Sequence, residues 1–151
     1  MYVLVTGGAG YIGSIVTNEL IREGYPVIAF DNLTKGHRLA VNPMATFIKG
    51  DLNDSNKLED LFSNYQIDVV IHLAGESVVA DSVVAPGRFF NGNVMCGINL
   101  MDTMIKRGVL HLVFSSTAAF YGSPRKCPIG ESAPKRPTNP YGEIGMDVLT
   151  D

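Results

Sequence analysis

Short apolar runs alternate with amphipathic stretches along most of the chain. A short apolar run bounded by polar residues or glycine is typical of a buried parallel strand, whereas apolar residues at every third or fourth position indicate a helix. The runs predict a first strand that begins at residue 2 and further strands at residues 27–30, 45–49, 68–73 and 110–114; the recurring positions predict helices at residues 11–23, 55–64 and 88–106. This alternation predicts an α/β fold with a parallel sheet covered by helices on both faces.

In two of the predicted helices the apolar positions fall on a single face. They are Ile12, Ile15, Val16 and Leu20 in helix 11–23, and Phe90, Val94, Ile98, Met101 and Ile105 in helix 88–106. A glycine, Gly24 or Gly108, follows each helix, as is common at helix C-termini. Such faces pack against a core in most proteins; for helix 88–106 the alternative is contact with a second copy of the chain.

Composition places the chain among ordinary globular proteins. Its 151 residues are 46% hydrophobic and 18% charged, with a formal net charge of −3, which suits one domain with a sizeable core. The absence of a basic excess argues against a nucleic-acid or membrane surface as the partner. No apolar run approaches the length of a membrane span and the first strand leaves no room for a signal peptide, so we expect a cytoplasmic protein.

Few residues suggest a metal site or a disulfide. The two cysteines, Cys96 and Cys127, stand in unrelated contexts without metal-ligand spacing, so we interpret them as ordinary thiols and predict no metal site. We interpret His72 and His111 as core residues and His37 as a turn residue that caps the turn. Residues 124–140 hold five of the eight prolines and predict a loop, to which we assign no binding role.

A glycine-rich turn, Thr6-Gly7-Gly8-Ala9-Gly10-Tyr11-Ile12-Gly13, joins the first strand to the first helix. Gly7 suits the tight turn, Gly10 lets backbone approach a diphosphate, and Gly13 lets helix and strand pack closely. The free N–H groups and the positive dipole end of the helix favour a bound anion without a basic side chain. The turn therefore predicts a phosphate-binding site.

An acidic residue follows the next strand at the position that this motif requires. Asp31 ends the apolar run 27–30 and stands eighteen residues beyond Gly13. There a carboxylate accepts hydrogen bonds from adenosine ribose hydroxyls and repels a 2′-phosphate, which favours NAD over NADP. The alternative is a plain tight turn with Asp31 as a loop residue. The combination predicts a Rossmann-type doubly wound parallel sheet with strand order 3-2-1-4-5.

Ligands of such sheets bind where the strands end, so the residues directly after each strand are candidates for chemistry. Four segments follow strands or open the last helix: residues 50–52, 74–76, 115–117 and 139–142. With the glycine turn, Asp31-Asn32-Leu33, Gly36-His37, His72-Leu73-Ala74-Gly75 and Tyr121-Gly122, they make the chain resemble the extended short-chain dehydrogenase/reductase family. Within its NAD-dependent epimerase/dehydratase group, the resemblance is strongest to the UDP-glucose 4-epimerases and covers nearly all of the chain.

The resemblance implies roles for individual residues. The implied catalytic residues are Thr117, a hydrogen-bond donor, and Tyr141, the acid/base group. The residues implied to contact NAD are Gly7, Gly10, Tyr11, Ile12, Gly13, Asp31, Asn32, Asp51, Leu52, Leu73, Ala74, Gly75, Asn93, Ser115 and Tyr141. The implied substrate is a nucleotide-sugar, UDP-glucose or UDP-galactose, used in galactose metabolism. The tyrosine takes the proton of the sugar 4-hydroxyl while NAD accepts and later returns a hydride.

Neighbouring activities share most of these motifs. Nucleotide-sugar 4,6-dehydratases need a carboxylate pair directly after the threonine, where this chain has Ala118 and Ala119, so elimination of water lacks its catalysts. Epimerases that act at other sugar positions and reductases of the same family stay open as alternatives. A binding module that holds NAD without catalysis is a further one.

The chain departs from the family pattern at three places. Gly145 stands where the family motif Tyr-x-x-x-Lys has its lysine, which holds the nicotinamide ribose and stabilises tyrosinate by its charge; Glu143 adds a negative charge nearby. Glu76 and Ser77 stand where epimerases often carry a cofactor-contacting lysine. The chain is also about half the family's usual length, so we interpret residues 1–151 as an NAD-binding domain that lacks the last strands and the substrate domain. We therefore expect impaired catalysis.

Overall fold

The computed structural model describes residues 1–124 and 126–147, with only the backbone of residues 146 and 147. It divides into two compact units. Unit 1 comprises residues 1–75 and 96–115, and unit 2 comprises residues 76–95 and 116–151. The interpretation of residues 1–151 as one domain stays a prediction.

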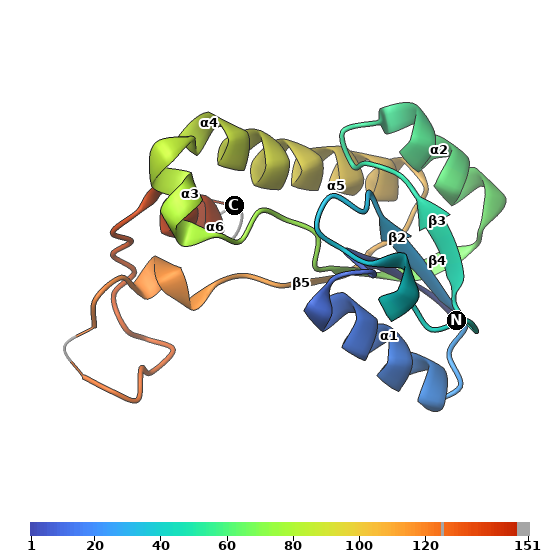
Figure 1. The fold of residues 1–151 in the computed structure, drawn as a ribbon, viewed down its shortest axis with the longest axis horizontal. Helices are drawn as coiled ribbons and strands as arrows, with labels where there is room; N and C mark the ends of the chain where they lie inside the picture. The colour runs from blue at the N-terminus through green and yellow to red at the C-terminus, as the bar shows by residue number, and fades with distance from the viewer. Residues whose placement is uncertain (125, 148–151) are drawn as a thin grey trace. The chain divides into compact units, whose positions relative to one another are not determined.

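Unit 1 is a five-stranded parallel sheet covered by three helices (Figure 1). Its strands are β1 (Tyr2–Thr6), β2 (Val27–Asp31), β3 (Thr46–Lys49), β4 (Ile67–His72) and β5 (His111–Phe114), in the order β3-β2-β1-β4-β5. Its helices are α1 (Tyr11–Arg22), α2 (Ser55–Asn64) and α5 (Cys96–Lys106), and a short 3-10 turn, η1, spans Arg38–Ala40. The predicted strand order is confirmed, and each predicted strand lies within a few residues of its observed bounds.

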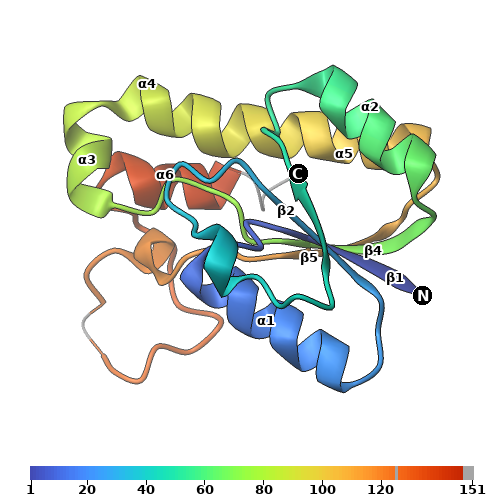
Figure 2. The same ribbon diagram turned by 45° about the vertical axis from the view of Figure 1, so that its right-hand side comes forward.

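The two faces of this sheet carry different layers of the core. On one face α1 packs its Val16, Leu20 and Ile21 against a cluster of valines from β1 and β2. On the other face α2 and α5 lie side by side and enclose the largest cluster, which includes Phe30 and Leu100 (Figure 2). Because successive residues of a strand point to opposite faces, each central strand contributes side chains to the core on both faces of the sheet.

The apolar face predicted for α1 is only partly a core face. Val16 and Leu20 pack against the sheet, but Ile12 is 59% exposed and Ile15 is 46% exposed. The fully buried positions of α1 are instead the small residues Gly13 and Thr17. Only two of the four apolar residues predicted on one face of this helix therefore pack in the core, because the helix approaches the sheet through its smallest side chains.

Unit 2 holds α3 (Val79–Val84), α4 (Pro86–Phe89), a π-helical segment η2 (Phe90–Met95), the 3-10 turn η3 (Ala118–Tyr121) and α6 (Pro140–Asp147). The sequence pattern did not predict α3. Between η3 and α6 the described residues, 122–124 and 126–139, contain no helix or strand, in agreement with the predicted loop.

The single helix predicted at residues 88–106 is three successive helical segments, α4, η2 and α5. The π-helical segment changes the residues per turn, so positions before it and positions in α5 do not keep the single predicted period. In α5 the core positions are Leu100 and Met104, whereas Ile98 is 41% exposed and Ile105 is 71% exposed. The core interpretation of the predicted stripe is therefore wrong for these two isoleucines.

Candidate functional site

The glycine turn after β1 adopts a conformation that only glycine tolerates at two positions. Gly7 has φ +69°, and a Cβ there would lie 2.8 Å from the backbone N of Ala74 at the end of β4. A Cβ on Gly13 would overlap the carbonyl oxygen of Gly7. The turn therefore lies directly on the backbone that follows β4, and α1 starts in contact with the turn.

The N-terminus of α1 suits an anionic group. Gly10 is its N-cap and has no side chain to accept the helix N–H groups, and the first turn carries no acidic residue. The first N–H groups of a helix have no partner within it, and the helix dipole adds positive potential at this end. The chain thus has a cradle of backbone that fits the diphosphate of a dinucleotide.

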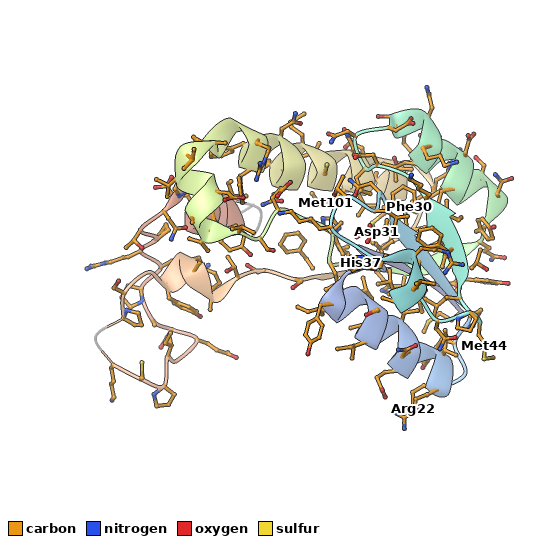
Figure 3. All side chains as sticks on the ribbon, viewed as in Figure 1. Arg22, Phe30, Asp31, His37, Met44 and Met101 are labelled. Carbon is orange, nitrogen blue, oxygen red and sulfur yellow. The ribbon has the colours of Figure 1, made fainter. Side chains whose placement is uncertain are left out.

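Asp31, at the carboxyl end of β2, joins the glycine turn to the segment after β2 by hydrogen bonds. Its side chain is buried, with Oδ2 accepting the Ala9 N–H at 3.0 Å and Oδ1 accepting the Leu33 N–H at 2.8 Å. The His37 N–H donates to the Ala9 carbonyl at 2.9 Å. Asp31 and His37 are labelled in Figure 3. Each carboxylate oxygen has a second lone pair, so the carboxylate retains acceptor capacity for ribose hydroxyls.

A second polar pair lies beside β2 and β3. The amide Nδ2 of Asn32 donates to Oδ2 of Asp51 at 2.9 Å, and the Asn53 N–H donates to the other oxygen at 2.9 Å. The backbone hydrogen bond from Asn53 lowers the pKa of Asp51, with the Asn32 amide adding to the effect. Leu52 is buried, and its carbonyl accepts a hydrogen bond from Asn99 Nδ2 at 3.1 Å. A hydrogen bond thus joins Asn32, predicted to hold the adenosine ribose, to Asp51, which with Leu52 is predicted to border the adenine.

The predicted residues after β4 and β5 also lie at this edge of the sheet. The Leu73 N–H donates to the Thr6 carbonyl at 3.1 Å, and the Ser115 N–H donates to the His72 carbonyl at 3.1 Å. Ala74 follows Leu73, and its backbone lies against Gly7 so closely that a Cβ on Gly7 would have no space. Gly75 is exposed. Unit 1 therefore gathers the glycine turn, the Asp31 segment and the ends of β4 and β5 at the carboxyl ends of its strands, where such sheets bind ligands.

Unit 2 holds the remaining predicted site residues, Asn93, Thr117 and Tyr141. The Asn93 side chain forms two hydrogen bonds with the backbone of Glu76. Its Oδ1 accepts the Glu76 N–H at 2.7 Å, and its Nδ2 donates to the Glu76 carbonyl at 3.0 Å. Arg88 forms ion pairs with Glu76 at 3.5 Å and with Asp81 at 3.2 Å. The segment after β4 is thus ordered by Asn93, where we predicted only a cofactor contact.

Thr117 and Tyr141 belong to elements of unit 2 that pack together, η3 and α6. The Thr117 hydroxyl is the N-cap of η3 and accepts the Ala119 N–H at 3.1 Å. Tyr141 lies in the first turn of α6 with its ring edge-on to Phe89, at a centroid distance of 6.4 Å. One turn further along α6, Gly145 supplies no side-chain cation. The roles assigned to both side chains stay predictions.

The structure corrects two of the histidine interpretations. His72 is buried, as predicted, whereas His111 at the start of β5 is exposed. His37 precedes η1, but its side chain makes no capping hydrogen bond. Within residues 1–124 and 126–147, no three His, Cys, Asp or Glu side chains lie close enough together to hold a metal ion. No helix among those residues is long and apolar enough to cross a membrane.

Three residues within the quoted motifs received no role of their own from the sequence. Thr6 lies under the turn, with its hydroxyl 2.6 Å from His72 Nδ1. Leu33 adopts a positive φ of 62°, which is uncommon for a residue with a branched side chain. Ser116 donates from Oγ to the Gly145 carbonyl at 3.4 Å. Thr6 and Ser116 each depend on a partner far away in sequence, which no local pattern reveals, whereas the N–H of Leu33 donates to Asp31, two residues earlier.

Unit 1 has the sheet order, glycine turn and strand-end carboxylate that define a Rossmann-type dinucleotide-binding fold. Residues 3–144 match the NAD dependent epimerase/dehydratase family, and the chain belongs to that family. It is 48% identical over 152 aligned residues to the UDP-glucose 4-epimerase of Streptococcus mutans. The alignment covers 99% of this chain and 46% of that protein.

Solved structures of the family have the same fold. The UDP-glucose 4-epimerase from Brucella ovis in complex with NAD matches with a TM-score of 0.93 at 37% identity, over 97% of this chain and 45% of that one. The enzyme from Thermotoga maritima with UDP-glucose matches with a TM-score of 0.92 at 39% identity, over 97% of this chain and 48% of that one. The chain therefore spans less than half the length of the relatives it matches.

Proposed function

We propose that this chain binds NAD and is the cofactor-binding part of a UDP-glucose 4-epimerase. The observation that carries the proposal is the fixed carboxylate of Asp31 beside the uncapped N-terminus of α1. This arrangement offers a diphosphate the N–H groups of a helix and offers ribose hydroxyls a carboxylate. Relatives solved in complex with NAD support the proposal.

Selectivity for NAD over NADP follows from the same carboxylate. Asp31 is held by two backbone N–H groups and cannot turn away without breaking both hydrogen bonds. A 2′-phosphate on the adenosine ribose would bring negative charge against this fixed negative charge. We therefore expect NADP to bind much more weakly than NAD.

The proposed substrates are UDP-glucose and UDP-galactose, which such an enzyme interconverts in the cytoplasm for galactose metabolism. Relatives that carry the name UDP-glucose 4-epimerase support this, as does a relative solved with UDP-glucose. In the reaction, NAD accepts a hydride from the sugar and returns it to the opposite face. Tyr141 would take and return the proton of the sugar 4-hydroxyl, and Thr117 would hold that hydroxyl by a hydrogen bond.

Gly145 favours a second candidate function, an NAD-binding module without turnover. The lysine of the family motif is absent at this position, so no cation on α6 stabilises an ionised Tyr141. Under this alternative the chain retains the site in unit 1 and lacks catalysis. The two candidates differ in turnover but agree on NAD binding.

We also propose that α5 contributes to a contact with a second copy of the chain. Ile98 and Ile105 are exposed on this helix, seven residues and about two turns apart. Apolar side chains repeated on one side of a helix favour an isologous contact. A light-scattering series at rising protein concentration should show a dimer; monomer throughout contradicts this proposal.

The experiment that tests the proposed function is a calorimetric titration of the purified chain with NAD and, separately, with NADP. We expect saturable binding of NAD and at least a tenfold weaker affinity for NADP. Equal affinities would remove the role of Asp31, and no binding of either nucleotide would contradict the proposal itself. An assay with UDP-galactose and NAD, made on Gly145→Lys with a substrate domain supplied, then separates the two candidates, because only the epimerase should gain turnover.

A further inference from the structure

The packing of α6 in unit 2 leaves no space for a side chain at residue 145. A Cβ on Gly145 would lie 2.5 Å from the γ-methyl carbon of Thr117 and 3.8 Å from the Thr117 Cβ. A carbon atom essentially never comes that close to another without a bond. The γ-methyl of Thr117 therefore occupies the space that a Cβ of residue 145 would need.

The backbone of α6 cannot simply move away to make that space. Ser116 Oγ donates to the Gly145 carbonyl at 3.4 Å, and Ile144, the neighbouring residue on α6, is only 2% exposed. One turn earlier, a Cβ on Gly142 would lie 2.7 Å from the Ala119 carbonyl oxygen. The helix is thus held close to residues 116–119 at two levels, and withdrawal would break a hydrogen bond and expose an apolar side chain.

Rotation of Thr117 is the other way to make space, and it moves the hydroxyl. The methyl and the hydroxyl are both bonded to Cβ, so they turn together about χ1 and settle in a different staggered rotamer. In the present rotamer Oγ1 accepts the Ala119 N–H at 3.1 Å and caps η3. A rotation that removes the methyl from residue 145 also removes this hydrogen bond.

We propose that residue 145 positions the hydroxyl of Thr117: with glycine there, the γ-methyl packs against α6 and the hydroxyl caps η3, whereas any side chain there turns Thr117 into another rotamer. Residues 117 and 145 then act as one unit. The inference rests on the proposed function only in that Thr117 is the residue proposed to hold the sugar hydroxyl; its geometry is independent of cofactor binding.

A consequence concerns the missing lysine. Gly145→Lys restores the residue type of the family motif, but its Cβ would displace Thr117 and with it the proposed sugar contact. Thr117→Ser removes the methyl and keeps the hydroxyl. In the Thr117→Ser background the Cβ of Gly145→Lys has no methyl to displace.

The test compares Gly145→Ala, Thr117→Ser and the double variant by thermal unfolding without cofactor. Gly97→Ala in α5 is the matched control, because a Cβ there meets no atom within 4 Å. Alanine is a better helix former than glycine, so the control should raise the unfolding midpoint by about 2–4 °C. Gly145→Ala should lower the midpoint, and Gly145→Ala in the Thr117→Ser background should raise it as the control does.

The rotamer of Thr117 gives a readout that a merely structural effect would not move. Three-bond NMR couplings to the Thr117 methyl carbon should change in Gly145→Ala and stay unchanged in Gly97→Ala. The proposal is overturned if Gly145→Ala raises the midpoint as the control does, if it lowers the midpoint equally in both backgrounds, or if the couplings stay unchanged. Failure of NAD to bind leaves these results unaffected, so the two proposals fail separately.

Discussion

The Thr6 hydroxyl and the His72 ring form a hydrogen bond at the carboxyl ends of β1 and β4, with 2.6 Å between Oγ1 and Nδ1. The two residues are register partners on β1 and β4, and the His72 ring lies 5.5 Å from the Phe114 ring. Burial lowers the pKa of His72 to about 4. The imidazole is therefore neutral in the folded chain near pH 7.

This burial predicts a loss of stability in mild acid. An unfolded histidine has a pKa of about 6.5. Below that pH, His72 is therefore protonated in the unfolded chain but stays neutral in the folded chain. The free energy of unfolding is unaffected by His72 above pH 6.5 and falls as pH drops toward 4, by about 2 kcal/mol at pH 5. Urea denaturation at pH 7 and pH 5 measures the difference.

The control for this prediction is His72→Asn, which keeps polar atoms but does not titrate. It should be less stable at pH 7 and should lose little further stability between pH 7 and pH 5. A wild-type chain with the same urea midpoint at both pH values would show that His72 is protonated without cost.

Asp31→Asn should destabilise unit 1 before any cofactor is considered. The two buried oxygens accept the Ala9 and Leu33 N–H groups, and an amide offers one oxygen and places an NH2 against the other donor. An unsatisfied buried polar group costs about 1–3 kcal/mol, so we expect a fall of that size in the free energy of unfolding. Asp60→Asn, at an exposed position of α2, makes the same charge change and should stay within about 0.5 kcal/mol of wild type.

Gly13→Ala should also destabilise the chain, although alanine favours a helix. Its Cβ would overlap the Gly7 carbonyl and lie 2.9 Å from the Gly8 Cα, so the turn or α1 must shift. Overpacking of this kind costs about 1–3 kcal/mol. Urea unfolding measures the effect against Gly97→Ala, where space is open; stabilisation by both variants would contradict close packing at the turn.

The two thiols should differ strongly in reactivity. Cys96 is buried at the start of α5, and burial raises its pKa to about 11, with the negative charge of Asp51 adding to the effect. Cys127 is exposed on the loop after η3. A thiol reagent at neutral pH should modify one thiol per folded chain and two in urea. Cys127→Ser should abolish the fast reaction; if Cys96→Ser abolishes it instead, α5 is not packed as described.

The sequence by itself determined the sheet order and the cofactor motif. Apolar runs and glycine positions are local features, and a strand-turn-helix with Asp31 at its spacing admits few other arrangements. The family motif also pointed to Thr117 and Tyr141, and to the lysine that Gly145 replaces. These features depend on residues close together along the chain, so they can be read from it.

The tertiary structure decided which side chains meet. Ile12 and Ile98 have the same apolar character as Val16 and Leu100, yet only the latter two are in the core, because burial depends on how each helix approaches the sheet. The contact of Thr117 with Gly145 likewise has no sequence signature. Close packing selects among residues of similar polarity by shape, and shape is complementary only once distant segments lie against each other.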